Sequence, residues 1–170
     1  MRYAGINWND MTASDGMCVT FYTQGCPHRC KGCHNPDTWD FMGGKEFPST
    51  LLDEIIQKLN AQNIPRAFCI MGGEPLCNEN LFLTRLLVST VKNKSPKTPI
   101  YVWTGYTIEE LNKNNPHLAD IFDNIDYLID GPYVEELRNV TLHMRGSSNQ
   151  RVINMREKKE NENNGSFYGT

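Results

Sequence analysis

Short apolar runs alternate with segments of helical periodicity over most of the chain. The runs at residues 17–23, 67–71, 99–103 and 126–129 are typical of buried strands, and residues 151–155 have the composition of another. Most of these runs end in turns that contain glycine. The pattern therefore predicts buried strands that are separated by longer connections.

The connections carry helix signals. Residues 49–60 place apolar side chains on one helical face after Pro48, and residues 81–92 form a second amphipathic segment. Thr107 and Glu110 have the spacing of a capping box, which opens a further helix. Strands and helices in alternation favour parallel β/α units, so we predict an α/β fold.

The length limits the architecture that these units can form. At 170 residues the chain suits one domain, and it is short for a closed eight-stranded barrel, which takes about 250 residues. We therefore expect an open or partial (β/α) barrel of parallel strands over residues 1–155. Residues 156–170 are polar and lack periodicity, and we expect them to form a mobile C-terminal tail.

Composition narrows the class of protein. Hydrophobic residues make up 39% and charged residues 22%, as in soluble globular proteins. A net charge of −3 gives no case for nucleic acid or an anionic membrane as a partner. No segment has the ~18 apolar residues of a membrane span and no secretory signal is visible, so we expect a cytoplasmic protein. In that reducing compartment the 6 cysteines are expected to be metal ligands or core residues rather than disulfides.

One loop contains Cys26, Cys30 and Cys33 in the spacing C-x3-C-x2-C. A cubane [4Fe-4S] cluster is ordinarily held by four cysteines, so three thiolates leave one iron without a protein ligand. An open coordination position is what allows a metal to bind and transform a substrate. The alternative is a structural zinc site with His28 or His34 as the fourth ligand. Structural zinc ligands commonly come as two pairs from separate elements, so the loop favours a catalytic iron–sulfur site.

Other candidate residues follow predicted strands, where the working residues of parallel β/α folds lie. Gly72 and Gly73 would allow the backbone to approach a ligand closely, and the Glu74 carboxylate could accept a hydrogen bond from an ammonium group. Thr104 and Asp130 could bind a ribose, a carboxylate or an ion, or they could serve only in turns.

The cysteine loop, followed by a strand that ends in Gly72-Gly73-Glu74-Pro75, resembles the radical S-adenosylmethionine enzymes. More narrowly, residues 1–155 resemble the activating proteins of anaerobic (class III) ribonucleoside-triphosphate reductases. The segments that carry this second resemblance are Cys33-His34-Asn35-Pro36, Trp103-Thr104-Gly105-Tyr106, Ile129-Asp130-Gly131-Pro132 and Arg145-Gly146-Ser147-Ser148-Asn149-Gln150.

The resemblance implies a fold, a reaction and partners. It implies a partial barrel of the radical-SAM type and a [4Fe-4S] cluster on which S-adenosyl-L-methionine is reductively cleaved. The resulting radical takes a hydrogen atom from a glycine in the large catalytic subunit of the reductase. An external one-electron donor such as a flavodoxin supplies the electron, and no catalytic residue is expected beyond the cluster-bound cofactor.

The resemblance also assigns roles to residues. It implies cluster ligation by the three loop cysteines and cofactor contacts from the Gly72–Glu74 segment, with Thr104 and Asp130 as further candidates. Many superfamily members carry an aromatic residue before the third cysteine, where this chain has Gly32. We therefore expect backbone contact to the cofactor from Gly32, Cys33 and His34 in place of side-chain stacking.

Two alternatives stay open at this point. One is the activation of another glycyl-radical enzyme, such as pyruvate formate-lyase, although some of those activases carry an added ferredoxin-like domain for which this chain has no second cluster motif. The other is a non-catalytic electron carrier or metal-binding module. Of the cysteines outside the loop, Cys18 and Cys69 are expected in the core, and Cys77 is expected to be structural.

Overall fold

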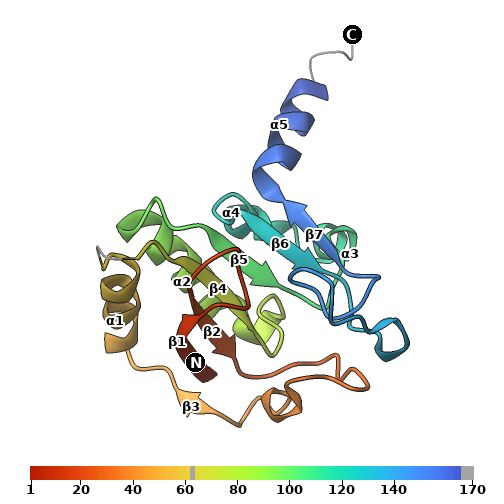
Figure 1. Cartoon of the computed structure of the whole chain (residues 1–170), viewed down its shortest axis with the longest axis horizontal. Coiled ribbons are helices and arrows are strands. Elements are labelled where there is room, and N and C mark those ends of the chain that lie inside the picture. Colours follow the sequence, from red (N-terminus) through yellow and green to blue (C-terminus); the bar gives the residue numbers. More distant parts are fainter. Residues whose placement is uncertain (62–63, 166–170) are drawn as a thin grey trace.

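The computed structural model describes residues 1–61 and 64–165, which form a mixed α/β domain (Figure 1). Its strands are β1 (Arg2–Asp10), β2 (Cys18–Thr23), β3 (Lys45–Glu46), β4 (Ala67–Gly72), β5 (Ile100–Trp103), β6 (Tyr127–Asp130) and β7 (Arg151–Asn154). Its α-helices are α1 (Thr50–Leu59), α2 (Asn78–Lys94), α3 (Ile108–Asn114), α4 (Ala119–Phe122) and α5 (Met155–Gly165). Short 3-10 helices cover Pro36–Thr38, Pro116–Leu118 and Glu135–Leu137.

The strands form one sheet in the order β3-β1-β2-β4-β5-β6-β7. The four central strands β2, β4, β5 and β6 are parallel, and helices α1 to α4 lie in the connections between them. The outer strands β1 and β7 pair antiparallel with their neighbours. The prediction of parallel β/α units is thus confirmed for the centre of the sheet, while the sheet as a whole is mixed.

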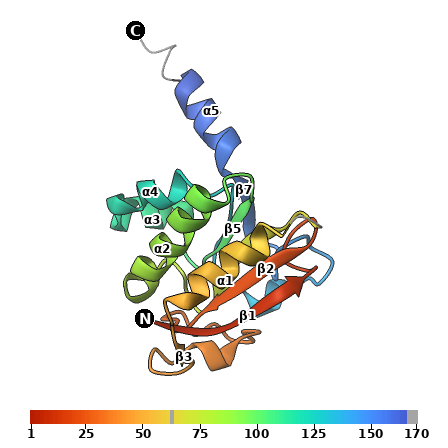
Figure 2. The ribbon, with the colours of Figure 1, turned by 90° about the vertical axis from the view of Figure 1, so that its left-hand side faces the viewer.

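The two faces of the sheet bury different side chains, because successive residues of a strand point to opposite faces. Phe21, Ile70 and Val102 face helices α1 to α4 and belong to the main apolar core. Cys69 and Tyr101 face the other way, into a smaller cluster without helices. Figure 2 shows these helices together on one side of the sheet, so no α-helix formed by the described residues covers the opposite face.

Strands β1 and β3 and helices α4 and α5 depart from the expectations. Strand β1 was not predicted, and it adds an antiparallel edge to the parallel centre. Residues 155–165 form helix α5, which projects from the body (Figures 1 and 2), where the sequence pattern indicated only a polar tail. Asn154 Oδ1 starts this helix by accepting hydrogen bonds from the N–H groups of Arg156 and Glu157. Residues 166–170 lie outside the described residues, and independent motion of residues 156–170 stays a prediction.

None of the helices formed by the described residues is long and apolar enough to cross a membrane.

Candidate iron–sulfur and cofactor site

The loops that follow β2, β4 and β5 meet at the carboxyl-terminal edge of the parallel strands. They enclose a cavity of about 260 Å³. Its lining includes Cys26, His28, Cys30, Cys33, His34, Gly72, Gly73, Glu74, Thr104, Gly105, Tyr133 and Gln150. The structure therefore gathers most of the residues predicted from the sequence around one cavity.

The three loop cysteines are half-buried free thiols, and all three line this cavity. The loop is closed by a hydrogen bond from the Cys33 N–H to the Cys30 carbonyl oxygen at 3.2 Å. Burial raises the pKa of the Cys26 and Cys30 thiols, so both are protonated at neutral pH until a metal displaces the proton. Among the described residues, no three His, Cys, Asp or Glu side chains are gathered as they would be around a single metal ion.

The remaining cysteines lie away from the cavity lining. Cys18 and Cys69 are fully buried on the helix-free face of the sheet, as core residues. The Cys77 thiol donates a hydrogen bond to the Glu74 carbonyl oxygen at 3.1 Å, and burial raises its pKa to about 12. These contacts agree with the expectation that Cys77 is structural. The donor set at the cavity is thus three thiols from one loop.

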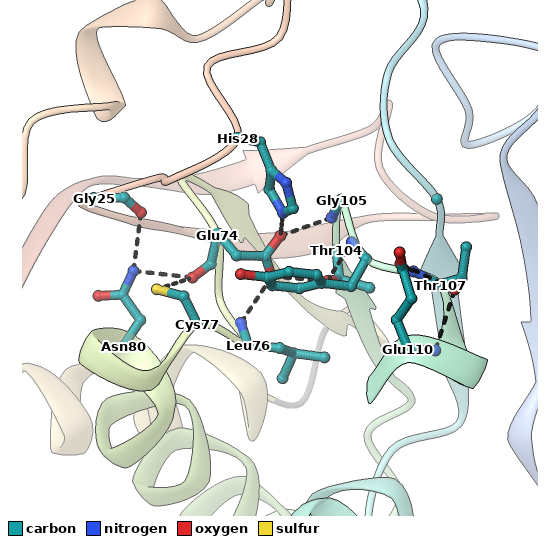
Figure 3. A network of polar contacts seen from close by, with 12 residues as sticks. Gly25, His28, Glu74, Leu76, Cys77, Asn80, Thr104, Gly105, Thr107 and Glu110 are labelled. Carbon is teal, nitrogen blue, oxygen red and sulfur yellow. Dashed lines mark hydrogen bonds and ion pairs between the residues drawn. The ribbon is translucent and has the colours of Figure 1, made fainter. Parts of the chain in front are cut away.

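Glu74 lines the cavity although only 1% of its surface is exposed, and its carboxylate accepts four hydrogen bonds (Figure 3). Oε1 accepts from the Leu76 N–H at 2.9 Å and from the Thr104 hydroxyl at 2.8 Å. Oε2 accepts from the Gly105 N–H at 2.7 Å and is 2.9 Å from Nε2 of His28. Sequence reasoning considered His28 only as a zinc ligand and missed this contact.

The glycines after β4 allow the cysteine loop to lie directly against the next turn. Gly72 has φ +104°, a conformation that L side chains rarely adopt. A Cβ on Gly73 would overlap the carbonyl oxygen of Gly25 and would lie 2.9 Å from the carbonyl carbon of Gly25. That oxygen accepts hydrogen bonds from the Glu74 N–H at 2.9 Å and from Nδ2 of the buried Asn80 at 3.1 Å. These bonds join the start of the cysteine loop to the turn after β4.

Gly32 and His34 take different positions. Gly32 has φ +71°, a conformation that L side chains rarely adopt, and a Cβ there would meet the side chain of Glu135, so the position favours glycine. Gly32 does not belong to the cavity lining, whereas His34 does. The His34 ring lies 5.6 Å from the ring of Tyr133, centroid to centroid, and forms an aromatic wall with it.

Asp130 is not brought to the cavity. Its side chain is fully buried and accepts hydrogen bonds from the Ile108 N–H at 2.8 Å and from Nε of Arg151 at 2.9 Å. Leu128, two residues earlier, belongs to the core under the helices, and by strand alternation Asp130 points to the same face, where Arg151 of the paired strand β7 meets it. Its contacts hold α3 and β7 to the end of β6.

The segment 145–150 closes the cavity on the side of β6. Oε1 of Gln150 accepts hydrogen bonds from the N–H groups of Gly146 and Ser147 at 2.9 and 3.2 Å. Its Nε2 donates to the Gly131 carbonyl oxygen at 3.0 Å. The motif that contributed to the family resemblance is therefore a structured wall rather than a solvated loop.

Comparisons with known proteins agree with this geometry. Residues 13–153 match the family described as a 4Fe-4S single cluster domain. The chain is 36% identical over 148 residues to the anaerobic ribonucleoside-triphosphate reductase-activating protein of Escherichia coli (strain K12), which covers 86% of this chain and 94% of that protein. The protein of the same name from Salmonella typhimurium is 36% identical over 157 residues, covering 92% and 100%. The one from Enterobacteria phage T4 is 33% identical over 152 residues, covering 89% and 93%. The chain belongs to the family of anaerobic ribonucleoside-triphosphate reductase-activating proteins.

Proposed function

We propose that this protein activates an anaerobic ribonucleoside-triphosphate reductase by reductive cleavage of S-adenosylmethionine, with a glycine of the reductase as the site of hydrogen removal. The observation that carries the proposal is the set of three thiols, from one loop, on a cavity at the carboxyl ends of parallel strands. The family membership supports the same activity.

The residues at the cavity fit an iron–sulfur cluster. Thiolates are the usual ligands of such clusters, and Cys26, Cys30 and Cys33 would hold one there. When bound, it supplies one electron at low potential and an iron that the protein leaves unligated. Because burial raises the pKa of Cys26 and Cys30, loading of the cluster releases protons from the loop.

The cofactor would lie against the turns around the thiols. We propose that the backbone at Gly72 and Gly73 receives its amino group, since both glycines line the cavity and have no side chain of their own to cover their backbone. Cys33 and His34 are proposed to contact it through their backbone, as is Gly32 from the edge of the site. We propose no cofactor contact for Asp130, because its carboxylate already accepts hydrogen bonds from α3 and β7.

The finer architecture that suits this function is an open partial barrel of the radical-SAM type, with helices outside and the substrate entering from the helix-free face. A second hollow of about 370 Å³ adjoins the site on that face and shares Met71, Trp103 and His34 with it. We propose that the glycine loop of the reductase reaches the site from this side. An external donor such as a flavodoxin would supply the electron.

The test is anaerobic reconstitution with iron and sulfide, followed by reduction and electron paramagnetic resonance spectroscopy. We expect a [4Fe-4S]⁺ signal that changes when S-adenosylmethionine is added, the release of methionine and 5′-deoxyadenosine, and a glycyl-radical signal in the reductase. Tightly bound zinc without a cluster, or a cluster that ignores the cofactor, would contradict the proposal. If the protein activates pyruvate formate-lyase but not the reductase, the proposed partner is wrong and the proposed reaction still holds.

A further inference from the structure

We infer that Glu74 is a positioning residue whose carboxylate fixes the cysteine loop through His28 and does not itself bind the amino group of the cofactor. The inference rests on the proposed function and assigns this residue a different role from the one that the sequence suggested.

The first argument is that the carboxylate has no free acceptor site. An ionised carboxylate offers about four lone-pair directions on its two oxygens. Each Glu74 oxygen already meets two protein donors, at distances between 2.7 and 2.9 Å. A ligand ammonium would have to displace one of them, and a buried donor left without a partner is costly. The hydrogen bonding of Glu74 is therefore complete without a ligand.

The second argument is where the four donors come from. His28 belongs to the cysteine loop, Leu76 to the turn after β4, and Thr104 and Gly105 to the turn after β5. One buried carboxylate thus joins three of the loops that form the cavity (Figure 3). His28 links Glu74 to the cysteines, because it lies between Cys26 and Cys30 in the sequence.

The third argument is that the His28 ring is held in a fitted slot. Its ring centroid lies 4.4 Å from that of Tyr106 in an edge-on arrangement. A Cβ on Gly105 would lie 2.6 Å from Cδ2 of His28, so the glycine leaves room for the ring. Nε2 donates to Glu74, so the ring is fixed by this bond as well as by its neighbours Tyr106 and Gly105. The slot and the carboxylate together therefore hold the part of the cysteine loop around His28 in one position.

The test compares variants of both partners in the reconstituted full-length protein. His28→Ala removes the donor, His28→Gln keeps a donor on a side chain of similar reach, and Glu74→Gln removes the charge. A matched control is His143→Ala, because His143 pairs with Asp15 at 2.8 Å on the surface, where its side chain is 65% exposed. The measurements are iron and sulfide per chain, the resonance spectrum of the reduced cluster, the rate of cofactor cleavage, and thermal melting of the metal-free protein.

We expect His28→Ala to shift the cluster spectrum and to lower the cleavage rate about ten- to hundredfold, as for other partners that orient metal ligands. His28→Gln should restore most of both, and His143→Ala should match the wild type. Glu74→Gln should also shift the spectrum in the absence of the cofactor.

If Glu74 instead binds the cofactor directly, Glu74→Gln will weaken cofactor binding while the spectrum without cofactor stays that of the wild type, and His28→Ala will behave like the control. Either result overturns the inference. A failure of the proposed function is distinguishable, because the wild type would then cleave no cofactor. Metal content and spectra of the His28 variants would still report on the position of the loop. If the His28→Ala protein does not fold, the cluster spectrum and cleavage rate of His28→Gln are compared with those of the wild type instead.

Discussion

Gly73→Ala tests how closely the cysteine loop lies against the turn after β4. The added Cβ would overlap the carbonyl oxygen of Gly25 and would lie 3.1 Å from the Gly25 nitrogen. Both of these atoms belong to the backbone. The Gly25 oxygen is also the acceptor for the Glu74 N–H and for Asn80. The loop can therefore yield to the methyl group only by giving up these two hydrogen bonds.

The magnitude follows from these contacts. Overpacking a close-packed site costs about 1–3 kcal/mol, and each lost hydrogen bond costs about 0.5–1.5 kcal/mol. We expect a total near 4 kcal/mol, which for a domain of this size lowers Tm by about 8–16 °C. The assay is thermal melting of the metal-free protein by circular dichroism, with iron content measured after reconstitution in parallel. Both should fall, because the displaced loop carries the thiols.

Gly16→Ala is the matched control. No atom lies within 4 Å of where its Cβ would be, and a compatible glycine-to-alanine change alters stability by less than about 1 kcal/mol. If the Gly73→Ala protein has the same Tm as the Gly16→Ala protein and binds as much iron, the loop does not lie closely against the turn. That result would also refute the geometry of the site.

Three further predictions use other contacts. Cys30→Ala should abolish the [4Fe-4S]⁺ signal and cofactor cleavage, and retained cleavage would exclude Cys30 as a ligand. Thr104→Val removes a donor to buried Glu74 and should cost about 1–3 kcal/mol in denaturant unfolding, whereas Thr104→Ser should cost less; equal losses would show that the hydroxyl bond is unimportant. Arg151 lowers the pKa of Glu109 to about 2 from 4.5 by hydrogen bonding, so the pair stabilises the fold above about pH 4.5 and less as pH falls toward 2. Arg151→Met should return the pKa toward 4.5 in an NMR titration, and an unchanged value would contradict the pairing.

The central strands could be predicted because their burial on both faces leaves continuous apolar runs in the sequence. Strand β1 could not, since its apolar side chains do not alternate regularly. Tyr3, Ile6 and Trp8 all pack against the core, but the register shifts between Tyr3 and Gly5. The spacing of these partly buried residues is therefore three across the bulge and two after it, which removes the period that identifies a strand.

Helix α5 was missed for a different reason. It projects from the body (Figure 2), so it has no apolar face along most of its length and no helical period in its hydropathy. The available signal was local: Asn154 and Glu157 have the spacing of a helix cap, and Nδ2 of Asn154 donates to Glu157 Oε1 at 3.0 Å. An ion pair between Lys159 and Asp123 at 3.0 Å links the helix to the domain.

The cluster loop and the rest of the site differ in how far the sequence reveals them. The cysteines belong to one loop, so their spacing alone brings three thiols together. Asp130 ends β6 and Thr104 directly follows β5, and nothing in the local sequence distinguishes their roles. They differ because β7 runs antiparallel in the register that pairs Asp130 with Arg151, and opposite charges on paired strands attract. Thr104 lies just beyond the last residue pair of β5 and β6, and its hydroxyl donates a hydrogen bond to Glu74. The direction and register of β7 depend on contacts between distant parts of the chain. The role of a polar residue at a strand end therefore depends on the neighbouring strand, which local spacing does not encode.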